Sequence, residues 1–245
     1  PTGVAAINAN GVTIHSFFQL PLSPFVPEST VKPRFEYSKQ KRQIMRTLDL
    51  LIIDEISMVR ADILDAIDSI LRRFREHNKP FGGVQLLMIG DLQQLTPIVR
   101  PDEEKLLSRY YNTPYFFDSK ALQSTQYVTI ELTKVFRQQD KVFIDILNHF
   151  RDGHVSDEDF DILNKRYQPN FSPDENSDYI HLTTHNRIAD NINDRQLEQI
   201  KEQVYKFCAR VEGQFPENSY PADYELTLKC GAQVMFIHND RFERY

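Results

Sequence analysis

Two segments decide the fold: LDLLIIDE at residues 48–55 and VQLLMIGD at residues 84–91. Each is a short apolar run that ends at acidic side chains, and neither alternates between apolar and polar positions. Uninterrupted hydrophobicity over about six residues is typical of a strand buried on both faces, as in a parallel sheet. The two runs therefore predict neighbouring parallel strands in an α/β fold.

The residues between these runs have the pattern of an amphipathic helix. Within 61–77, apolar side chains recur at spacings of three and four, which places them on one helical face. A strand, a helix and a second parallel strand form a right-handed βαβ unit. The apolar positions of the expected helix are Ile63, Leu64, Ile67, Ile70, Leu71 and Phe74.

The rest of the chain predicts a third strand and then a second α/β unit. We therefore place a domain boundary near Thr133, giving a first domain of 1–133 and a second of 134–245. The further elements expected are strands at 127–132, 179–183 and 226–238, and helices at 141–151, 156–167 and 186–203.

The composition excludes several classes of protein. Hydrophobic residues make up 40% of the 245 residues and charged residues 26%, which is ordinary for a globular protein and unlike disordered, collagenous or coiled-coil chains. No run reaches the roughly 18 apolar residues of a membrane span, and the start lacks a signal-peptide pattern. We expect a cytoplasmic, nucleoid-associated protein of bacterial type without membrane contact, with Cys208 and Cys230 as packed thiols.

Polar side chains gather where the two predicted strands end. Ligands of parallel sheets bind at the carboxyl ends of the strands, which here lead to Asp54, Glu55 and residues 90–91. An aspartate there can hold Mg²⁺ through water, a glutamate can polarise an attacking water, and the amides of Gln93 and Gln94 can bind a terminal phosphate. For the Asp-Glu pair alone, the alternative is that the strand ends where it meets solvent.

A nucleotide site of this type also needs a phosphate-binding loop of the form G-x-x-x-x-G-K-[ST]. The 245 residues contain no such loop. Two explanations are open: the nucleotide interpretation is wrong, or the loop precedes Pro1.

Five segments, in order, resemble successive motifs of the Pif-type DNA helicases, superfamily 1 motors related to RecD that move from 5′ to 3′. The resemblance implies two RecA-like domains, both incomplete, and an ATP-dependent DNA helicase or translocase of replication, repair or recombination. It also implies ATP and Mg²⁺ as cofactors, single-stranded and forked DNA as partners, and a monomer. The segments are PTGVAAINANGVTIHSFF (1–18), LLIIDEISMV (50–59), PFGGVQLLMIGDLQQLTPIV (80–99), ELTKVFRQQD (131–140) and LKCGAQVMFIHND (228–240).

In that family the phosphate loop lies upstream of the first segment, and two further motifs lie downstream of the last. The resemblance therefore implies a central fragment that ends near the start of an SH3-like insertion. We expect residues 1–245 alone to be inactive, because the phosphate-loop lysine and the last arginine motif are absent from them.

The resemblance assigns ATP chemistry to particular residues. Asp54 is expected to organise Mg²⁺ through water, Glu55 to activate the hydrolytic water, and Gln94 to sense the terminal phosphate. Thr96 stands where the family's motif usually has its first proline, which leaves Gln94 in place but makes the loop less rigid.

A further arginine is expected to complete the ATP site from the second domain. Arg137, in VFRQ, matches an arginine that reaches across the domain cleft and stabilises transferred charge. The alternative is an ordinary surface arginine, which we expect Arg151 and Arg195 to be.

The resemblance also assigns DNA contacts in the first domain. Thr2 and Gly3 begin a helix whose amides can hold a phosphate. His15, Ser16 and Phe17 match a second DNA motif, in which a hydroxyl, an imidazole and an aromatic ring suit hydrogen bonds to the backbone and base stacking. From the residues alone, Phe17 is a core residue and His15 a hydrogen-bonded polar group.

In the second domain, Thr184, His185 and Asn186 open a helix and are expected to hold another phosphate. An ordinary helix N-cap is the competing interpretation.

Residues 20–46 are expected to form a wedge-like insertion that meets duplex DNA at a fork. The stretch 21–33 carries four prolines, and 32–46 is rich in lysine and arginine although the whole chain has a net charge of −6. A solvated helix face is the alternative.

Three other functions remain open from the sequence. The chain can be a RecD-like motor subunit of an exonuclease complex or a non-catalytic RecA-like DNA-binding module. It can also be a magnesium-dependent nuclease, which would require Asp54, Glu55 and Asp91 to share one metal ion.

Overall fold

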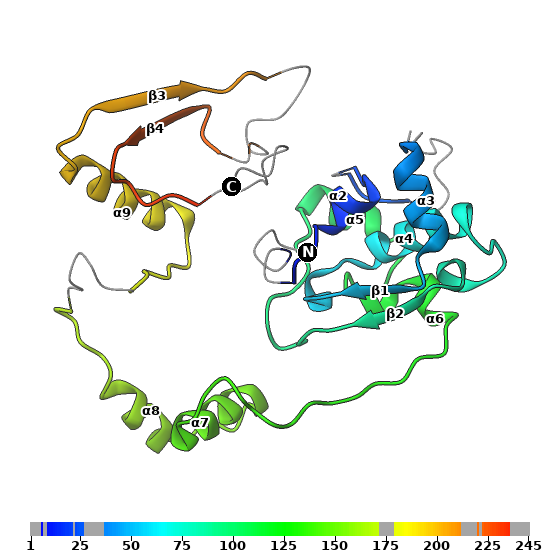
Figure 1. The fold of residues 1–245 in the computed structure, drawn as a ribbon. Coiled ribbons are helices and arrows are strands. Elements are labelled where there is room, and N and C mark those ends of the chain that lie inside the picture. Colours follow the sequence, from blue (N-terminus) through cyan, green and yellow to red (C-terminus); the bar gives the residue numbers. More distant parts are fainter. Residues whose placement is uncertain are drawn as a thin grey trace. The chain divides into compact units, whose positions relative to one another are not determined.

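A computed structural model describes residues 6, 9–21, 23–26, 37–171, 179–211, 220 and 222–235. The chain forms two compact units, Pro1–Asp159 and Phe160–Tyr245, each of which is described by itself (Figure 1). Within the described residues, no helix has both the length and the hydrophobicity needed to cross a membrane.

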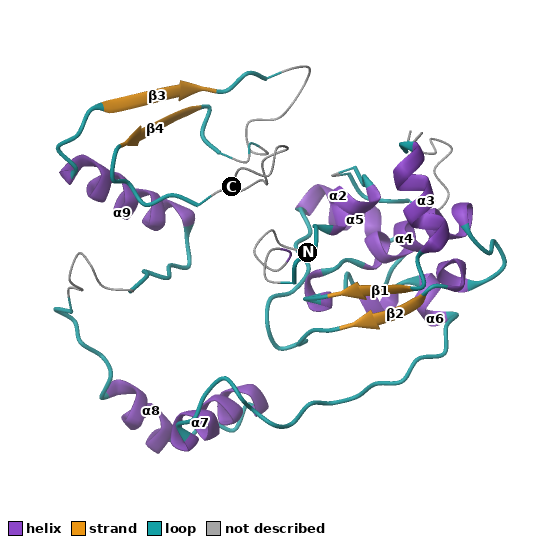
Figure 2. Ribbon diagram, viewed as in Figure 1, coloured by secondary structure: helices purple, strands orange, loops and turns teal. Residues whose placement is uncertain are grey.

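The first unit is built on two parallel strands. Strand β1 (Leu50–Ile53) pairs with β2 (Gln85–Met88), so that Ile53 lies opposite Met88, and helix α4 (Ala61–Phe74) connects the strands. Figure 2 shows the two strands side by side. The parallel pairing and the connecting helix confirm the predicted strand-helix-strand order.

Only one face of this sheet is buried. Ile53 is 3% exposed and belongs to the core, against which Leu51 packs. On the opposite face Ile52 is 55% exposed and Leu87 is 46% exposed. The expectation of burial on both faces is therefore wrong for the described residues, because α4 and its neighbours cover a single face. An apolar run indicates that a strand can be buried on both faces, but it does not show that other elements pack against the second face.

The remaining elements of the first unit are mostly short. Helix α7 begins after Asp140, whose side chain accepts the amide N–H of Phe143 at 3.2 Å, and ends at Gly153, which confirms the helix predicted at 141–151. The elements are α2 (Ile14–Phe18), α3 (Lys39–Thr47), η1 (Ile56–Met58), η2 (Pro80–Gly83), α5 (Pro101–Leu107), η3 (Phe116–Asp118), α6 (Lys120–Gln123), α7 (Lys141–Asp152) and α8 (Asp157–Asn164), which crosses into the second unit.

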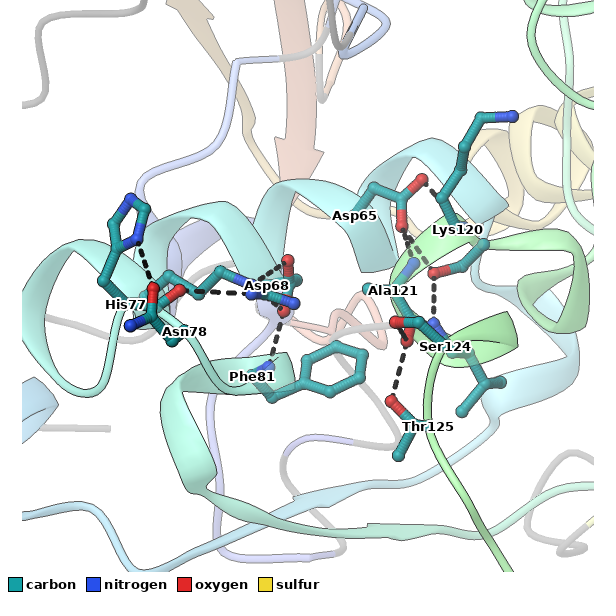
Figure 3. Close-up of polar contacts among 12 residues, drawn as sticks. Asp65, Asp68, His77, Asn78, Phe81, Lys120, Ala121, Ser124 and Thr125 are labelled. Atoms are coloured by element: carbon teal, nitrogen blue, oxygen red, sulfur yellow. Dashed lines mark hydrogen bonds and ion pairs between the residues drawn. The ribbon is translucent and has the colours of Figure 1, made fainter.

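A buried carboxylate joins α4 to the segment around α6. Asp65 is 7% exposed and accepts hydrogen bonds from the Ser119 hydroxyl at 2.6 Å and from the amide N–H of Ala121 at 2.9 Å (Figure 3). The Tyr111 hydroxyl donates to the same carboxylate at 2.7 Å. Burial raises the pKa of the Tyr111 hydroxyl, and its hydrogen bond to Asp65 raises it further. These bonds fix α6 against α4.

A second carboxylate holds the turn that precedes β2. Asp68 accepts the amide N–H of Phe81 and forms an ion pair with Arg72 at 2.7 Å (Figure 3). Phe81 is 1% exposed and has a φ of 51°, and Gly82 has a φ of 61°. A Cβ atom at Gly82 would lie 2.7 Å from the carbonyl oxygen of Leu71, so the PFGG turn requires glycine there. The turn sets where β2 begins.

The second unit contains a helix and a hairpin. Helix α9 (Asn186–Gln199) is followed by β3 (Val204–Cys208) and β4 (Glu225–Lys229), which pair antiparallel. The Lys229 ammonium donates to the carbonyl oxygens of Ile200 at 2.7 Å and Glu198 at 3.3 Å, which joins the hairpin to the end of α9.

Several expectations for the later part of the chain are wrong. Residues 127–132 and 179–183 form no strand, and Val128 and Leu182 are 86% and 89% exposed. An alternating apolar pattern gives a strand only where another strand accepts its hydrogen bonds, and the described residues provide none there. The last expected strand, 226–238, is short, since β4 ends at Lys229 and residues 236–238 lie outside the described residues.

The two cysteines also differ from expectation. Cys208 and Cys230 are exposed rather than packed. Every residue of β3 is exposed, so a two-stranded hairpin with one helix leaves Cys208 open to solvent.

The first unit extends further than the boundary predicted near Thr133. It ends at Asp159 and includes α7, whose Arg151 forms an ion pair with Asp91 at 2.8 Å. The division into two RecA-like domains stays a prediction.

Candidate functional site

The carboxyl ends of β1 and β2 lie at one edge of the sheet. The amide N–H of Ile89 donates to the carbonyl oxygen of Ile53 at 2.9 Å, and the amide N–H of Ile56 donates to the carbonyl oxygen of Ile89 at 2.9 Å. These bonds continue the pairing past the last strand residues. The two segments predicted to carry chemistry, 54–55 and 90–91, therefore follow neighbouring strands at the same edge, as the sequence indicates.

Glu55 occupies an unusual backbone conformation. Its φ of 52° and ψ of 45° lie in the left-handed region, which residues other than glycine rarely adopt. The Asp54 carboxylate accepts the amide N–H of Glu55 at 2.9 Å, and the carbonyl oxygen of Glu55 accepts the amide N–H of Met58 at 3.1 Å. Such conformations persist where surrounding bonds hold them, and they cluster at functional sites. The turn fixes the start of the Glu55 side chain.

Gly90 makes room for this turn. A Cβ atom at this position would lie 2.9 Å from Cγ2 of Ile56, 3.0 Å from the amide nitrogen of Ile56 and 3.1 Å from that of Ser57. Two of these three neighbours are backbone atoms, which cannot rotate away. Only glycine allows the two strand ends to approach this closely.

Asp91 connects the loop after β2 to α7. One carboxylate oxygen accepts the amide N–H of Gln93 at 3.1 Å and the Arg151 guanidinium at 2.8 Å, and the other accepts the Gln94 side-chain amide at 3.1 Å. Burial raises the pKa of Asp91, but the bonds from Gln94, Gln93 and Arg151 outweigh it and hold the pKa below its usual value. Asp91 is therefore charged and orients Gln94.

Arg151 lies at the surface, as expected, and also forms an ion pair with Asp91. Its side chain is 51% exposed, but its guanidinium reaches Asp91. The two residues are 60 positions apart in the sequence, and no short-range pattern predicts a contact over that separation.

The bonds of Asp91 also bear on the nuclease alternative. Both of its oxygens are engaged by Gln93, Gln94 and Arg151 rather than by a site shared with Asp54 and Glu55. The part of the chain that the structure describes contains no group of three or more His, Cys, Asp or Glu side chains that could hold a metal ion.

Asp54 nevertheless fits a magnesium ion that keeps most of its waters. It is a half-buried carboxylate at the end of a strand, and Mg²⁺ in nucleotide sites is bound through one or two carboxylates and several waters. The amide N–H of Glu55 fixes the orientation of the Asp54 carboxylate.

Arg137 belongs to neither a helix nor a strand. It is exposed in the irregular segment between α6 and α7. Its approach to a nucleotide stays a prediction.

Helix α2 carries the residues expected to contact DNA in the first unit. The Thr13 side chain caps the helix by accepting the amide N–H of Ser16 at 3.3 Å, and Phe18 is 1% exposed in the core. Burial lowers the pKa of His15, and the positive charge of Arg60 lowers it further, so His15 is neutral at pH 7. Thr2 and Gly3 lie outside the described residues.

The basic helix α3 is anchored to α2 and α4. The Tyr37 hydroxyl donates to the carbonyl oxygen of Phe18 at 2.7 Å, and the Arg75 guanidinium donates to the carbonyl oxygen of Arg46 at 2.7 Å. Met45 is fully buried, and burial raises the pKa of Tyr37 to about 12. Helix α3 is therefore a fixed part of the unit. Residues 22 and 27–36 of the expected wedge-like insertion lie outside the described residues.

A buried ion-pair network, which the sequence did not predict, connects three segments beside α2. The Arg60 guanidinium donates two hydrogen bonds of 2.8 Å to Asp62 and one of 3.0 Å to Glu103, at the start of α5. Asp62 is 1% exposed and also accepts the amide N–H of Phe25 at 2.9 Å. Burial lowers the pKa of Arg60, but the bonds to Asp62 and Glu103 outweigh it and raise the pKa.

The second unit holds the remaining predicted DNA contacts at the start of α9. His185 occupies the N-cap position, but its side chain makes no capping hydrogen bond. Instead, the Thr184 hydroxyl lies 2.8 Å from Nδ1 of His185. Capping by the His185 side chain, one form of the competing interpretation, is therefore absent, and a DNA role of Thr184, His185 and Asn186 stays a prediction.

Comparison with known proteins identifies the family that these features resemble. A family model described as PIF1-like helicase matches residues 1–161. The human ATP-dependent DNA helicase PIF1 is 36% identical over 253 residues, which include 97% of this chain and 36% of the human protein. The chain spans between 27% and 36% of the length of three curated relatives.

Two solved structures are similar along the whole chain. One is a Bacteroides Pif1 bound to single-stranded DNA, with 40% identity, a TM-score of 0.90, and coverage of 100% of this chain and 56% of that one. The other, with the same identity and TM-score and 57% of its own length covered, is described as showing DNA unwinding at forked double-stranded DNA by two coordinating Pif1 helicases.

Proposed function

The chain belongs to the PIF1-like helicase family, and from this premise we propose that it carries part of the ATP-hydrolysing and DNA-binding machinery of an ATP-dependent DNA helicase moving from 5′ to 3′. The observation that carries the proposal is the edge where β1 and β2 end. There the Asp54–Glu55 turn is hydrogen-bonded to the end of β2, and Gln94 follows in the next loop.

Each residue at this edge has a proposed role in ATP hydrolysis. The Glu55 carboxylate orients the attacking water and accepts its proton. Asp54 would hold Mg²⁺ through a water, and the ion would supply positive charge against the phosphates. Gln94, oriented by Asp91, hydrogen-bonds the terminal phosphate, and Arg137 stabilises the charge that develops on it.

DNA contacts are proposed on both units. In the first unit, the start of α2 offers His15 and Ser16 to a single strand, together with Thr2 and Gly3, and Phe17 lies beside them. In the second unit, Thr184, His185 and Asn186 open α9 and supply another contact. Residues 20–46 meet the duplex at a fork, and the anchored basic helix α3, which is held beside α2, contacts the single strand next to this duplex.

The direct test is to measure ATP hydrolysis and strand separation by the intact protein. We expect ATP hydrolysis that single-stranded DNA stimulates, and unwinding of a forked duplex with a 5′ tail but not of one with only a 3′ tail. DNA cleavage without ATP would favour the nuclease alternative instead. DNA binding without ATP hydrolysis would favour a non-catalytic module.

Reversing the charge of Lys39, Lys41 and Arg42 on α3 is expected to weaken DNA binding. Each lost phosphate contact to a single strand lowers the slope of log affinity against log salt by about 0.7. Affinity should be measured by fluorescence anisotropy over a series of salt concentrations. Reversal of Lys79, Lys105 and Arg109, basic residues elsewhere on the same unit, is the matched control. An unchanged affinity and slope in the α3 variant would contradict a DNA role for this helix.

Gly90→Ala is expected to slow ATP hydrolysis more than it weakens ATP binding. The added methyl group displaces the Ile56–Ser57 backbone and with it the Glu55 side chain, and a misplacement of about 1 Å can cost roughly 100-fold in rate. We expect a turnover number at least about tenfold lower, measured by phosphate release without DNA. Gly11→Ala is the control, because its Cβ would meet only an ordinary contact at 3.8 Å. Equal rates in the two variants would show that the close approach at Gly90 is unimportant.

A further inference from the structure

The Phe17 ring in α2 lies against a lysine of α3. The Lys41 ammonium lies 4.1 Å from the centroid of the Phe17 ring, within the range of a cation–π interaction. The Phe17 ring also meets the Phe18 ring edge-on, with centroids 4.8 Å apart, and packs against the core of the unit. A DNA base could stack on the face beneath Lys41 only by displacing the ammonium.

We propose that Phe17 acts in DNA binding through Lys41: the ring positions the Lys41 ammonium to bind a backbone phosphate and does not stack on a base. This inference rests on the proposed DNA-binding function and changes the role that the sequence suggested for Phe17. Phe17 is then a positioning residue and Lys41 the residue that touches DNA.

The surroundings of Lys41 fit a phosphate contact. Burial lowers the pKa of Lys41, so its ammonium is partly stripped of water, and no ion pair between Lys41 and a carboxylate is found among the described residues. Helix α3 carries no acidic residue, and its neighbouring basic side chains Lys39 and Arg42 are exposed. A phosphate therefore meets a basic surface on which Lys41 is already partly desolvated.

The geometry also explains why an aromatic ring is useful there. A free lysine side chain loses much rotamer freedom when it binds a ligand, and holding it in place beforehand reduces that cost. The bond from the Tyr37 hydroxyl to the carbonyl oxygen of Phe18 fixes the start of α3 beside α2. The fold therefore places Phe17 and Lys41 within reach of each other.

The test compares two single strands of equal length, oligothymidylate and the same backbone without bases. Phe17→Leu, Lys41→Met and the double variant are made in the intact protein, with Lys105→Met, a change at an exposed lysine of α5, as the matched control. We expect Phe17→Leu to lower the affinity for both strands by the same factor, roughly fivefold, as expected for the loss of one partly exposed charge contact. Lys41→Met should also lower the affinity for both strands, and it should lower the slope of log affinity against log salt by about 0.7. The double variant should bind both strands as Lys41→Met alone does.

Three results would overturn the inference. If Phe17→Leu lowers the affinity for oligothymidylate but not for the abasic strand, the ring stacks on a base. Independent, additive losses from the two single variants would show that the residues act separately. An unchanged affinity in Phe17→Leu, with normal binding by the unsubstituted protein, would remove Phe17 from DNA binding and leave the proposed function intact.

Two further measurements separate positioning from folding. Phe17→Tyr keeps the aromatic face and is expected to bind both strands as the unsubstituted protein does, whereas a Phe17→Leu protein that unfolds would show a lowered melting temperature. If Phe17→Tyr binds as weakly as Phe17→Leu, the ring does not act through Lys41. If the unsubstituted protein binds neither strand, the proposed function fails and this inference fails with it.

Discussion

Glu55→Gln in the intact protein is expected to lower the ATP turnover number by roughly 10²- to 10⁴-fold, the usual contribution of a general base. The amide has nearly the same shape as the carboxylate but cannot accept the proton of the attacking water. The left-handed turn at Glu55 is held by backbone bonds and by Asp54, so the substitution leaves the geometry in place. ATP and DNA binding are expected to change by less than about twofold, because a general base acts mainly in the transition state.

The measurement is steady-state phosphate release with saturating single-stranded DNA, together with separate binding titrations for ATP and DNA. Glu104→Gln, an exposed residue of α5, is the matched control and should leave turnover unchanged. If Glu55→Gln keeps more than about a tenth of the activity, another group accepts the proton. A parallel loss of ATP binding would instead show that Glu55 supports the nucleotide.

Arg60→Ala is expected to cause the largest loss of stability, about 3–5 kcal/mol, which is typical of removing one partner from a buried ion pair. The substitution leaves the Asp62 carboxylate, 1% exposed, without its cation and removes a hydrogen bond from Glu103. Asp62 also holds the backbone of Phe25, so we expect the segment 23–26 beside α2 to loosen as well. At roughly 2–4 °C per kcal/mol, the melting temperature should fall by about 10 °C.

The comparison for this prediction is an exposed ion pair in the same unit. Lys79 and Glu76 are 2.8 Å apart with side chains 61% and 56% exposed, and such pairs contribute about 0–1 kcal/mol. Differential scanning fluorimetry of Arg60→Ala and Lys79→Ala should therefore give clearly different melting temperatures. Equal shifts would mean that the Arg60 network contributes no more than a surface contact.

Much of the first unit could be predicted because local patterns there agree with the fold. The apolar runs at 48–55 and 84–91, and the helical spacing between them, correspond to β1, β2 and α4. The parallel pairing follows from this order and places Asp54 and Gln94 after neighbouring strands. The end of α7 was equally clear, because glycine is the residue most often found where a helix ends, and Gly153 occupies that position.

Other features could not be predicted, because they depend on residues that are distant in the sequence. The Arg151–Asp91 pair, the Arg60–Asp62–Glu103 network and the placing of Lys41 over Phe17 all join separate segments. Periodicity and motif spacing describe a segment by itself and carry no information on which side chains meet. The strand predicted at 127–132 is absent for the same reason. An alternation of apolar residues indicates a tendency to form a strand, but it does not show that a partner strand is present.

By itself, the sequence determined the chemistry available at the sheet edge: which residues follow each strand, and the family to which their order belongs. The tertiary structure decided how those residues are held. It placed Glu55 in a left-handed turn against Gly90, engaged both oxygens of Asp91, and covered Phe17 with Lys41. The physical reason is that residue types and short-range periodicity are local properties, whereas close packing, ion pairing and desolvation arise only when distant segments share the same space.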